Sequence, residues 1–238
     1  MNIGIIVPME AELEELLKKV KYEEKDYKGI KVYEFDTKMG HCFTFLGKIG
    51  KTNTGFDLGY LASQIEFNHL FVLGVSASLV NDIMPLNVVL ATKVCYYDVD
   101  ITSDGKHQIG QMAGEPLYFE CDKRILKISN FLNTTLTLRQ GLVISGDSFA
   151  TKKNITKELL SNFDNPLAID MESASVGQIA RRLNIPFNVI RGISDQLMDD
   201  IKAQDDVFTE FTSLSARRAA SILLHILNEE LTVDESEI

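Results

Sequence analysis

The chain has 238 residues, 45% of them hydrophobic and 24% charged, which is typical of a soluble globular protein with a sizeable core. Its formal net charge of -10 argues against a nucleic-acid partner, because binding the phosphate backbone requires a basic surface. No apolar run approaches the roughly 20 residues of a membrane-spanning helix, and three scattered cysteines fit a reducing cytoplasm better than a disulfide framework.

Hydrophobic periodicity predicts alternating strands and helices, which is typical of an α/β fold. We expect strands at residues 3–7, 30–35, 42–46, 69–73, 88–96, 141–145, 167–169 and 187–190, and helices at residues 9–20, 52–64, 121–132, 152–163, 173–183 and 207–231. The first apolar run is too short for a secretory leader, so we expect none. Residues 1–231 read as one domain, followed by an acidic tail at residues 232–238.

A long loop is expected at residues 98–119, where periodicity is weak and Gly105, Gly110, Gly114 and Pro116 recur. Long loops without regular structure are uncommon inside compact domains and are usually functional, for example as lids or contact segments.

Three carboxylates stand where the chain is expected to leave buried strands: Glu12, Glu172 and Asp195. Ligand crevices of open α/β sheets lie at the carboxyl ends of the strands. Three acids there could protonate a leaving group, activate a water and hold a sugar hydroxyl, which indicates hydrolysis of a glycosidic bond. Each has a simpler explanation. Glu12 could be a solvated helix residue, which is what we expect for Glu14 and Glu15. Glu172 could cap a helix, and Asp195 could lie in a turn.

Other site types fit the sequence poorly. The GKT sequence at residues 50–52 ends like a phosphate-binding P-loop, but the required glycine position holds Phe45. Residues 146–150 imitate a nucleophile elbow without its last glycine, and only His225 follows as a base. The histidines and cysteines lack ligand spacing, so we expect no metal site.

An ordered set of motifs resembles the family of 5'-methylthioadenosine/S-adenosylhomocysteine nucleosidases: Glu12, SGDSF at residues 145–149, DME at residues 170–172 and ISD at residues 193–195. The resemblance implies a three-layer α/β/α fold around a mixed, partly closed sheet, as in nucleoside phosphorylases. It also implies a homodimer without metal or cofactor. The substrate would be an adenine nucleoside with a 5' thioether, cleaved by water to adenine and a thioribose.

The resemblance also implies residue roles. Glu12 would be the water-activating base, Asp195 the acid that protonates the purine, and Met171 with Glu172 the ribose-binding pair. Phe149 would stack on adenine, the backbone of Ala150 would address its edge, and Phe208 would lie near the 5' group. Ser194 and Arg191 would support the acid, and Ala77 and Ile49 complete the substrate-binding set.

Adenine leaves poorly as an anion, so its N7 must gain a proton while positive charge develops on the sugar. Burial of Asp195 would raise its pKa and suit it to this role. Water is the favoured nucleophile because Glu10 and Glu12 lie where phosphate would bind, and a carboxylate about 5 Å from phosphate costs about 3 kcal/mol at a dielectric of 20. A phosphorylase, another purine nucleoside hydrolase and a slow nucleoside sensor are the alternatives.

Two segments depart from the family. A Gly-Ser-Ala-Gly-Gly-like stretch is usual where this chain has GVSAS at residues 74–78, so Ala77 and Ser78 add side chains that narrow the pocket. Asp104 stands in the long loop where relatives commonly have an aromatic that reaches the neighbouring subunit. An acid suits an apolar alkylthio group badly, so a more polar 5' group is an alternative.

Overall fold

The computed structural model describes residues 1–129 and 138–229. Its elements, in chain order, are β1 (Asn2–Val7), α1 (Glu10–Leu17), β2 (Glu23–Tyr27), β3 (Ile30–Asp36), β4 (His41–Leu46), α2 (Lys51–Ala62), β5 (His69–Ser78), β6 (Val88–Tyr96), the 3-10 turn η1 (Thr102–Asp104), β7 (Phe119–Glu120), α3 (Lys123–Ser129), β8 (Leu138–Ser145), α4 (Lys157–Leu160), β9 (Ala168–Asp170), α5 (Ser173–Leu183), β10 (Phe187–Gln196) and α6 (Ile201–Asn228).

All the described strands belong to one mixed sheet, and part of that sheet closes on itself. Strand β10 pairs with β6 on one side and with β5 on the other. The ring is completed because β6 pairs with β8, β8 with β9, and β9 with β5. From β5 the sheet continues as an open wing through β1, β4, β3 and β2. The expected mixed, partly closed sheet is therefore confirmed.

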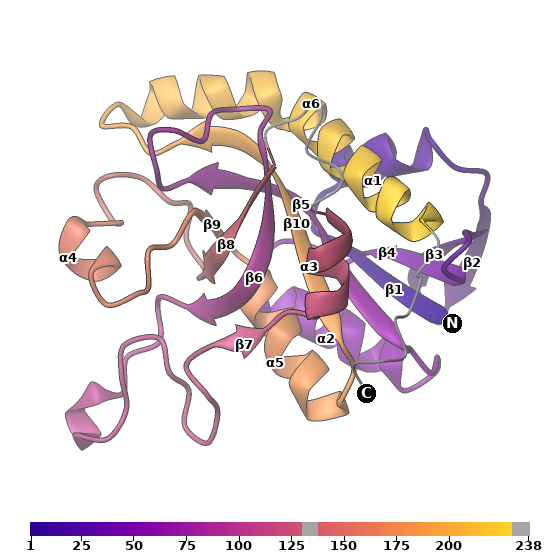
Figure 1. Ribbon diagram of the computed structural model, residues 1–238, viewed down its shortest axis with the longest axis horizontal. Helices are drawn as coiled ribbons and strands as arrows, with labels where there is room; N and C mark the ends of the chain where they lie inside the picture. The colour runs from indigo at the N-terminus through magenta and orange to yellow at the C-terminus, as the bar shows by residue number, and fades with distance from the viewer. Residues whose placement is uncertain (130–137, 230–238) are drawn as a thin grey trace.

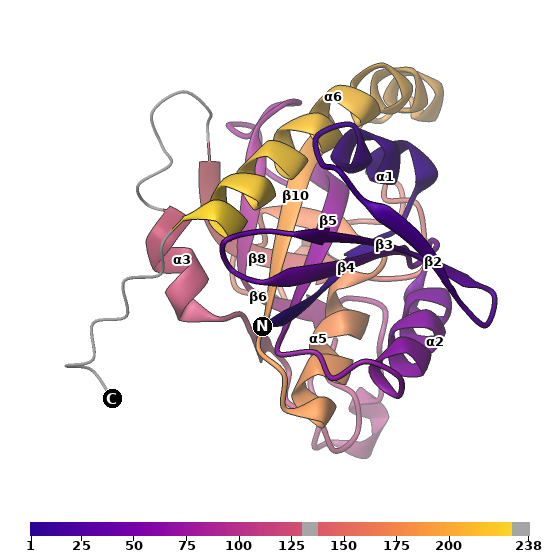
Figure 2. The ribbon, with the colours of Figure 1, turned by 90° about the vertical axis from the view of Figure 1, so that its right-hand side faces the viewer.

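Helices cover both faces of this sheet, which gives the expected three layers (Figures 1 and 2). Helices α1 and α6 pack together on one face, and α2 and α5 pack together on the other. Along β1, Ile5 belongs to the core under α1 and α6, whereas Ile6 belongs to the core against α2 and α5. Strands buried on both faces read as continuous apolar runs, which is why the sequence reveals β1 and the start of β5 so clearly.

Several predicted boundaries are wrong. Strands β5 and β10 continue beyond residues 73 and 190 into polar sequence that resembles a loop. The helix expected at residues 152–163 is reduced to α4, because Asn154 Oδ1 accepts the Thr151 N–H in a turn and Thr156 caps a new start. Helix α6 begins at Ile201, six residues earlier than expected, and Asp200 is its N-cap. Strand β2 was missed because it is a charged edge strand.

The remaining expected elements agree with the structure to within a few residues, and α5 and β6 match at both ends. The long loop expected at residues 98–119 is confirmed except at its last residue, where the short strand β7 begins, and η1 lies inside it. The end of the helix expected at residues 121–132 and the tail at residues 232–238 lie outside the described residues. Within the described part of the chain, no helix is both long and apolar enough to cross a membrane.

Candidate active site

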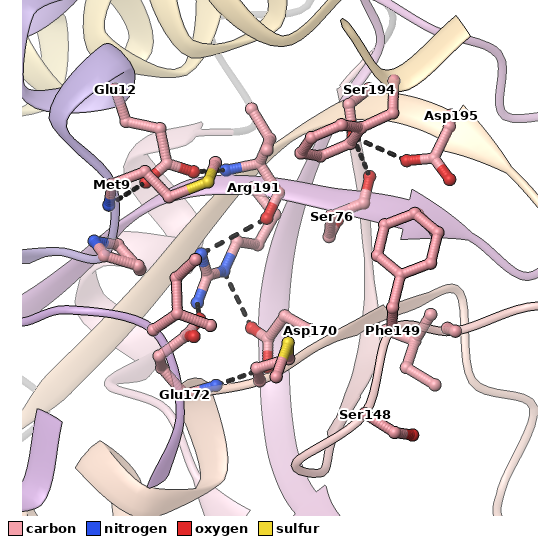
Figure 3. Close-up of a pocket in the computed structure, with 18 residues that line it drawn as sticks. Met9, Glu12, Ser76, Ser148, Phe149, Asp170, Glu172, Arg191, Ser194 and Asp195 are labelled. Atoms are coloured by element: carbon pink, nitrogen blue, oxygen red, sulfur yellow. Dashed lines mark hydrogen bonds and ion pairs between the residues drawn. The ribbon is translucent and has the colours of Figure 1, made fainter. Parts of the chain in front are cut away.

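One pocket gathers every residue to which the sequence analysis assigned a catalytic or substrate-binding role (Figure 3). It lies at the carboxyl ends of β1, β5, β9 and β10, as expected for an α/β sheet. About 610 Å³ of empty space lies within the pocket, and part of it is open to solvent. The pocket is lined by Pro8, Met9, Glu12, Ile49, Val75, Ser76, Ala77, Ser148, Phe149, Ala150, Ile169, Asp170, Met171, Glu172, Arg191, Ser194, Asp195 and Phe208.

Glu12 is a buried pocket residue and not a solvated helix residue, with 1% of its surface exposed. Its Oε2 accepts the Met9 N–H at 2.8 Å, which ties the side chain to the start of α1. Its Oε1 accepts the Val75 N–H from β5 at 2.6 Å. Burial raises the pKa of Glu12 to about 8, against the lowering effects of Arg191 and these amides.

Two further glutamates of α1, Glu14 and Glu15, differ from each other. Glu14 is exposed, as expected. Glu15 was expected to point to solvent as well, and this is wrong: it is buried and forms a 2.7 Å ion pair with Arg217 of α6. The partner lies 202 positions along the chain, so local periodicity gives no sign of it.

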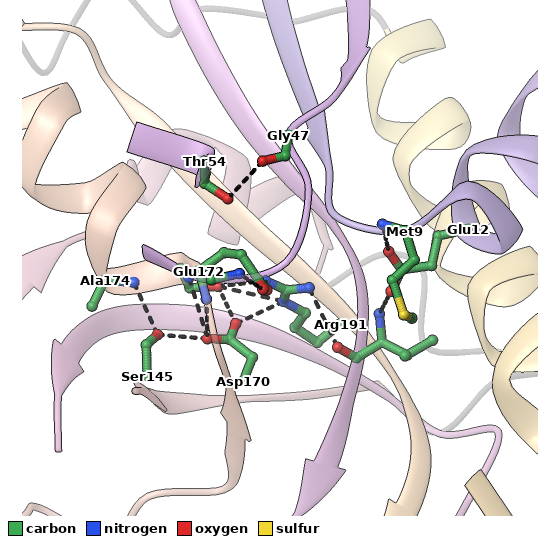
Figure 4. Close-up of polar contacts among 12 residues, drawn as sticks. Met9, Glu12, Gly47, Thr54, Ser145, Asp170, Glu172, Ala174 and Arg191 are labelled. Carbon is green, nitrogen blue, oxygen red and sulfur yellow. Dashed lines mark hydrogen bonds and ion pairs between the residues drawn. The ribbon is translucent and has the colours of Figure 1, made fainter. Parts of the chain in front are cut away.

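Glu172 stands at the N-cap position of α5, but its side chain does not cap the helix. Asp170 does so instead, because its Oδ1 accepts the backbone N–H groups of Glu172 and Ser173 at 3.2 Å (Figure 4). The Glu172 carboxylate is therefore free for the pocket, where Oε1 accepts the Gly50 N–H at 3.0 Å and Oε2 accepts Arg191 Nη2 at 3.2 Å.

Arg191 supports Glu172 and Asp170, and not the acid Asp195 as the family resemblance implied. Its Nε forms a 2.8 Å ion pair with Asp170, and Nη1 donates to the Val75 carbonyl at 3.3 Å. Burial disfavours the charged guanidinium, yet the surrounding carboxylates keep its pKa above the usual value. For Glu172, burial raises the pKa of the carboxyl, and the positive charge of Arg191 limits that rise.

Gly74 makes room for this arrangement. A Cβ there would lie 2.4 Å from Arg191 Nη1 and 2.7 Å from Glu12 Oε1. Both side chains reach across β5 at this point, so the glycine is required by close approach.

Asp195 lies near the end of β10, beside a register shift between Ile193 and Asp195. Such a bulge re-aims side chains, and here both Ser194 and Asp195 line the pocket. The Ser194 hydroxyl lies 2.7 Å from Asp195 Oδ1, as expected for a supporting residue. Burial raises the pKa of Asp195, while hydrogen bonds from Ser194 and Gln204 oppose that rise.

Apolar groups also line the pocket. Phe149 and Phe208 meet edge to face with ring centroids 5.8 Å apart. Phe149 remains 44% exposed and Ile49 48% exposed, so both present free apolar surface at the pocket. Asp104 is outside the pocket lining, where its carboxylate accepts the N–H groups of Lys106 and His107.

Sequence reasoning assigns no role to Asp170 and Gln204, two polar residues that contact the proposed site residues. Asp170 was noticed only as part of a motif, although it holds both Arg191 and the start of α5. Gln204, which contacts Asp195, gives no signal in the sequence because it lies among charged residues before the helix expected at residues 207–231. Among the described residues, no group of His, Cys, Asp and Glu side chains could hold a metal ion.

Comparisons with known proteins agree with one another. A family model described as phosphorylase superfamily matches residues 2–228. A 5'-methylthioadenosine/S-adenosylhomocysteine nucleosidase from Desulfotalea psychrophila is 27% identical over 96% of this chain and 98% of its own. Another with that name, from Buchnera aphidicola subsp. Acyrthosiphon pisum, is 31% identical over 82% of this chain and 85% of its own.

Solved structures of proteins with that name are also similar. The enzyme from S. pneumoniae, solved with a transition-state inhibitor, superposes with a TM-score of 0.87 at 31% identity, covering 95% of this chain and 98% of its own. A putative enzyme from Borrelia burgdorferi, solved with adenine, has a TM-score of 0.87 at 27% identity, covering 94% of this chain and 98% of its own.

Proposed function

Because the chain belongs to the phosphorylase superfamily and, within it, to the family of 5'-methylthioadenosine/S-adenosylhomocysteine nucleosidases, we propose that its pocket hydrolyses the N-glycosidic bond of these two nucleosides. The products are adenine and the corresponding thioribose. The observation that carries the proposal is that Glu12, Glu172 and Asp195 line one pocket together with the partly exposed ring of Phe149.

Each acid is proposed for one role in this reaction. Asp195 protonates purine N7, so that adenine leaves as a neutral base, and its raised pKa supports this assignment. Glu172 binds the ribose hydroxyls and stabilises the developing oxocarbenium ion. Glu12 accepts a proton from the attacking water when its carboxylate is ionised. The water oxygen then bonds to the sugar carbon that the purine leaves.

The remaining lining residues are proposed as binding groups. Phe149 stacks on adenine, the Ala150 backbone addresses the adenine edge, and Met171 contacts the ribose. Phe208 and Ile49 favour an apolar alkylthio group at the 5' position, because both present apolar surface to the pocket.

The charges of the pocket favour water over phosphate as nucleophile. Arg191 is the one arginine among the lining residues, and its charge is already matched by Asp170 at 2.8 Å and Glu172 at 3.2 Å. Glu12 adds a further acid to the lining, and its charge also acts on Arg191. A phosphate anion would therefore meet an acidic site without an unpaired cation.

Incubation of the purified protein with 5'-methylthioadenosine, with and without phosphate, tests the proposal by chromatography of the purine and sugar products. We expect adenine and free methylthioribose at the same rate in both reactions. A requirement for phosphate with a sugar phosphate as product would identify a phosphorylase, and no adenine release would overturn the proposal.

We also propose a single catalytic domain at residues 1–231 that works as a homodimer in the cytoplasm, in methionine salvage. The continuous sheet supports one domain, and Phe56 of α2, 68% exposed, supplies apolar surface for a second copy. Three free, buried cysteines suit a reducing compartment. Light scattering on the purified protein tests the dimer, and a monomer at micromolar concentration would exclude it.

A further inference from the structure

The side chain of Gln204 joins two parts of the pocket that the sequence keeps far apart. It is fully buried in the first turns of α6. Its Nε2 lies 2.8 Å from the Ala150 carbonyl oxygen and 2.8 Å from Asp195 Oδ2. Its Oε1 accepts the Met198 N–H at 2.9 Å. The amide therefore contacts the proposed acid, the proposed reader of the adenine edge and the loop between β10 and α6.

The orientation of this amide is determined by its neighbours. The Met198 N–H can only donate, so the atom facing it must be the amide oxygen. The amide nitrogen then has two protons for two acceptors, Ala150 O and Asp195 Oδ2. Every donor of this buried side chain is used, which holds it in one rotamer.

We infer that Gln204 is a positioning residue that holds the Asp195 carboxylate and the Ala150 carbonyl at a fixed separation, so that one amide couples recognition of the adenine edge to protonation of the purine. This inference rests on the proposed function and goes beyond it, because the family resemblance assigned no role to this position.

The proton-transfer step shows what the contact with Asp195 contributes. The acid gives its proton to purine N7 while the bond from the sugar carbon to N9 breaks and its electron pair moves into the purine. Asp195 is left as a carboxylate, and the Gln204 N–H on Oδ2 stabilises that ion. Ser194 adapts to either state, because its hydroxyl lies 2.7 Å from Oδ1 and 3.3 Å from the Ser76 carbonyl.

Of the side chains that the structure describes, Ser194 and Gln204 are the two that hydrogen-bond to the Asp195 carboxylate. Glu12 of α1, Glu172 before α5 and Arg191 of β10 line the same pocket. Lys152 and Asp199, which do not line the pocket, pair with each other at 3.0 Å.

Among the described residues, no charged side chain is a cause of the shift in the pKa of Asp195. That shift follows from burial, which raises the pKa, and from Ser194 and Gln204, which lower it.

The contact with Ala150 bears on the choice of base. A carbonyl oxygen has two lone pairs, and Gln204 occupies one of them. The other can accept the 6-amino group of adenine, whereas the 6-oxo group of hypoxanthine would set oxygen against oxygen. Fixing this carbonyl should therefore favour 6-amino over 6-oxo purines.

Gln204→Met tests the inference, because methionine fills similar volume without hydrogen bonds to either acceptor. Ser215→Ala is the matched control: Ser215 is buried on the same helix and donates to the Ile193 carbonyl at 2.6 Å, away from the pocket lining. For each protein, kcat/KM is measured against pH with 5'-methylthioadenosine, and compared at one pH with 5'-methylthioinosine.

In Gln204→Met we expect the basic limb of the pH profile to move up by about one pH unit, because the ionised acid loses a donor. Its plateau should fall about tenfold, and the preference for the 6-amino substrate should fall at least about tenfold. Ser215→Ala should keep the wild-type limb and preference.

A folded Gln204→Met protein with the wild-type limb and base preference would overturn the inference. If that variant does not fold, Gln204→Asn carries the same test, because its shorter amide cannot span both acceptors. Wild-type protein without hydrolytic activity would instead contradict the proposed function, so the two failures are distinguishable.

Discussion

The Oε1 atom of Glu12 accepts the Val75 N–H at 2.6 Å, which fixes a side chain of α1 to β5 inside the pocket. The second oxygen accepts the Met9 N–H at 2.8 Å. With both oxygens held, the carboxylate has little freedom to rotate. A base that must meet one water molecule benefits from such fixed geometry.

Replacing Glu12 by glutamine should lower kcat by at least about 10², because the amide cannot accept the proton of the attacking water. Asp195→Asn should lower kcat by a similar factor, because it cannot protonate the purine. Steady-state rates with 5'-methylthioadenosine check both variants, and circular dichroism checks their fold. Glu14→Gln, on the exposed side of α1, is the matched control and should retain full turnover. Near-normal turnover in either active-site variant would remove that residue from its role.

The pKa of Glu12 also predicts a pH-dependent cost to stability. Burial raises it from 4.5 to about 8, so the folded protein retains a proton that the unfolded chain releases. The protonated carboxyl contributes fully to the free energy of unfolding below pH 4.5, and this contribution is lost as the pH rises to about 8. Glu12→Gln cannot ionise, so relative to wild type its Tm should rise by about 10 °C between about pH 5 and pH 8.

Thermal unfolding of both proteins across this range measures that difference. The comparison uses the change with pH and not the Tm at a single pH, because the glutamine amide also alters the contacts with two backbone N–H groups. Parallel Tm curves for the two proteins would show that Glu12 is already ionised in the folded state at pH 5.

His69 should have the opposite pH dependence at the other end of β5. Asn188 Nδ2 donates to the Asp122 carbonyl, so its Oδ1 must accept from His69 Nε2 at 2.9 Å. His69 Nδ1 is then buried without a hydrogen bond among the described residues. Burial lowers the pKa of His69 from 6.5 to about 4, so the unfolded chain takes up a proton first as the pH falls.

Stability should therefore be lost through His69 as the pH falls from about 6.5 to about 4. In His69→Gln, which stays neutral, the loss of unfolding free energy between about pH 7 and pH 5 should be smaller by about 2 kcal/mol. Urea unfolding at the two pH values measures it. An equal loss in variant and wild type would mean that His69 keeps an ordinary pKa when folded.

The elements that can be predicted from the sequence are those whose buried residues form a regular hydrophobic pattern. The continuous apolar residues of β1 and the amphipathic α5 follow directly from periodicity. The end of β10 does not, because Arg191, Ser194 and Asp195 are polar and yet fully or almost fully buried. Their burial is possible only because partners arrive from β5, β9 and α6, which no local pattern reveals.

The same distinction holds within the site. Glu12, Glu172 and Asp195 could be selected because acids after strands are a recognisable signal. The partners of Arg191 could not be predicted. Arg191 is close to Asp195 in the sequence, but its guanidinium pairs with Asp170 and Glu172. Side-chain direction along β10 decides this, and the bulge near Ser194 alters that direction.

Arg191 provides a prediction about stability. It is fully buried, and it neutralises Asp170 at 2.8 Å and Glu172 at 3.2 Å. Arg191→Met should lower the free energy of unfolding by about 3–5 kcal/mol, because it leaves two buried carboxylates without their cation. Arg139→Met is the surface control. Arg139 pairs with Asp82 at 2.7 Å but both are exposed, so that change should cost at most about 1 kcal/mol.

The triple variant Arg191→Met, Asp170→Asn, Glu172→Gln separates loss of charge balance from loss of packing. Without the buried anions it should recover most of the stability, because a buried ion pair contributes little over neutral groups of similar size. It should not recover activity, because Glu172 would no longer stabilise the sugar cation. Urea unfolding and adenine release measure the two effects. If the triple variant is as unstable as Arg191→Met, packing of the guanidinium and not its charge holds this part of the fold together.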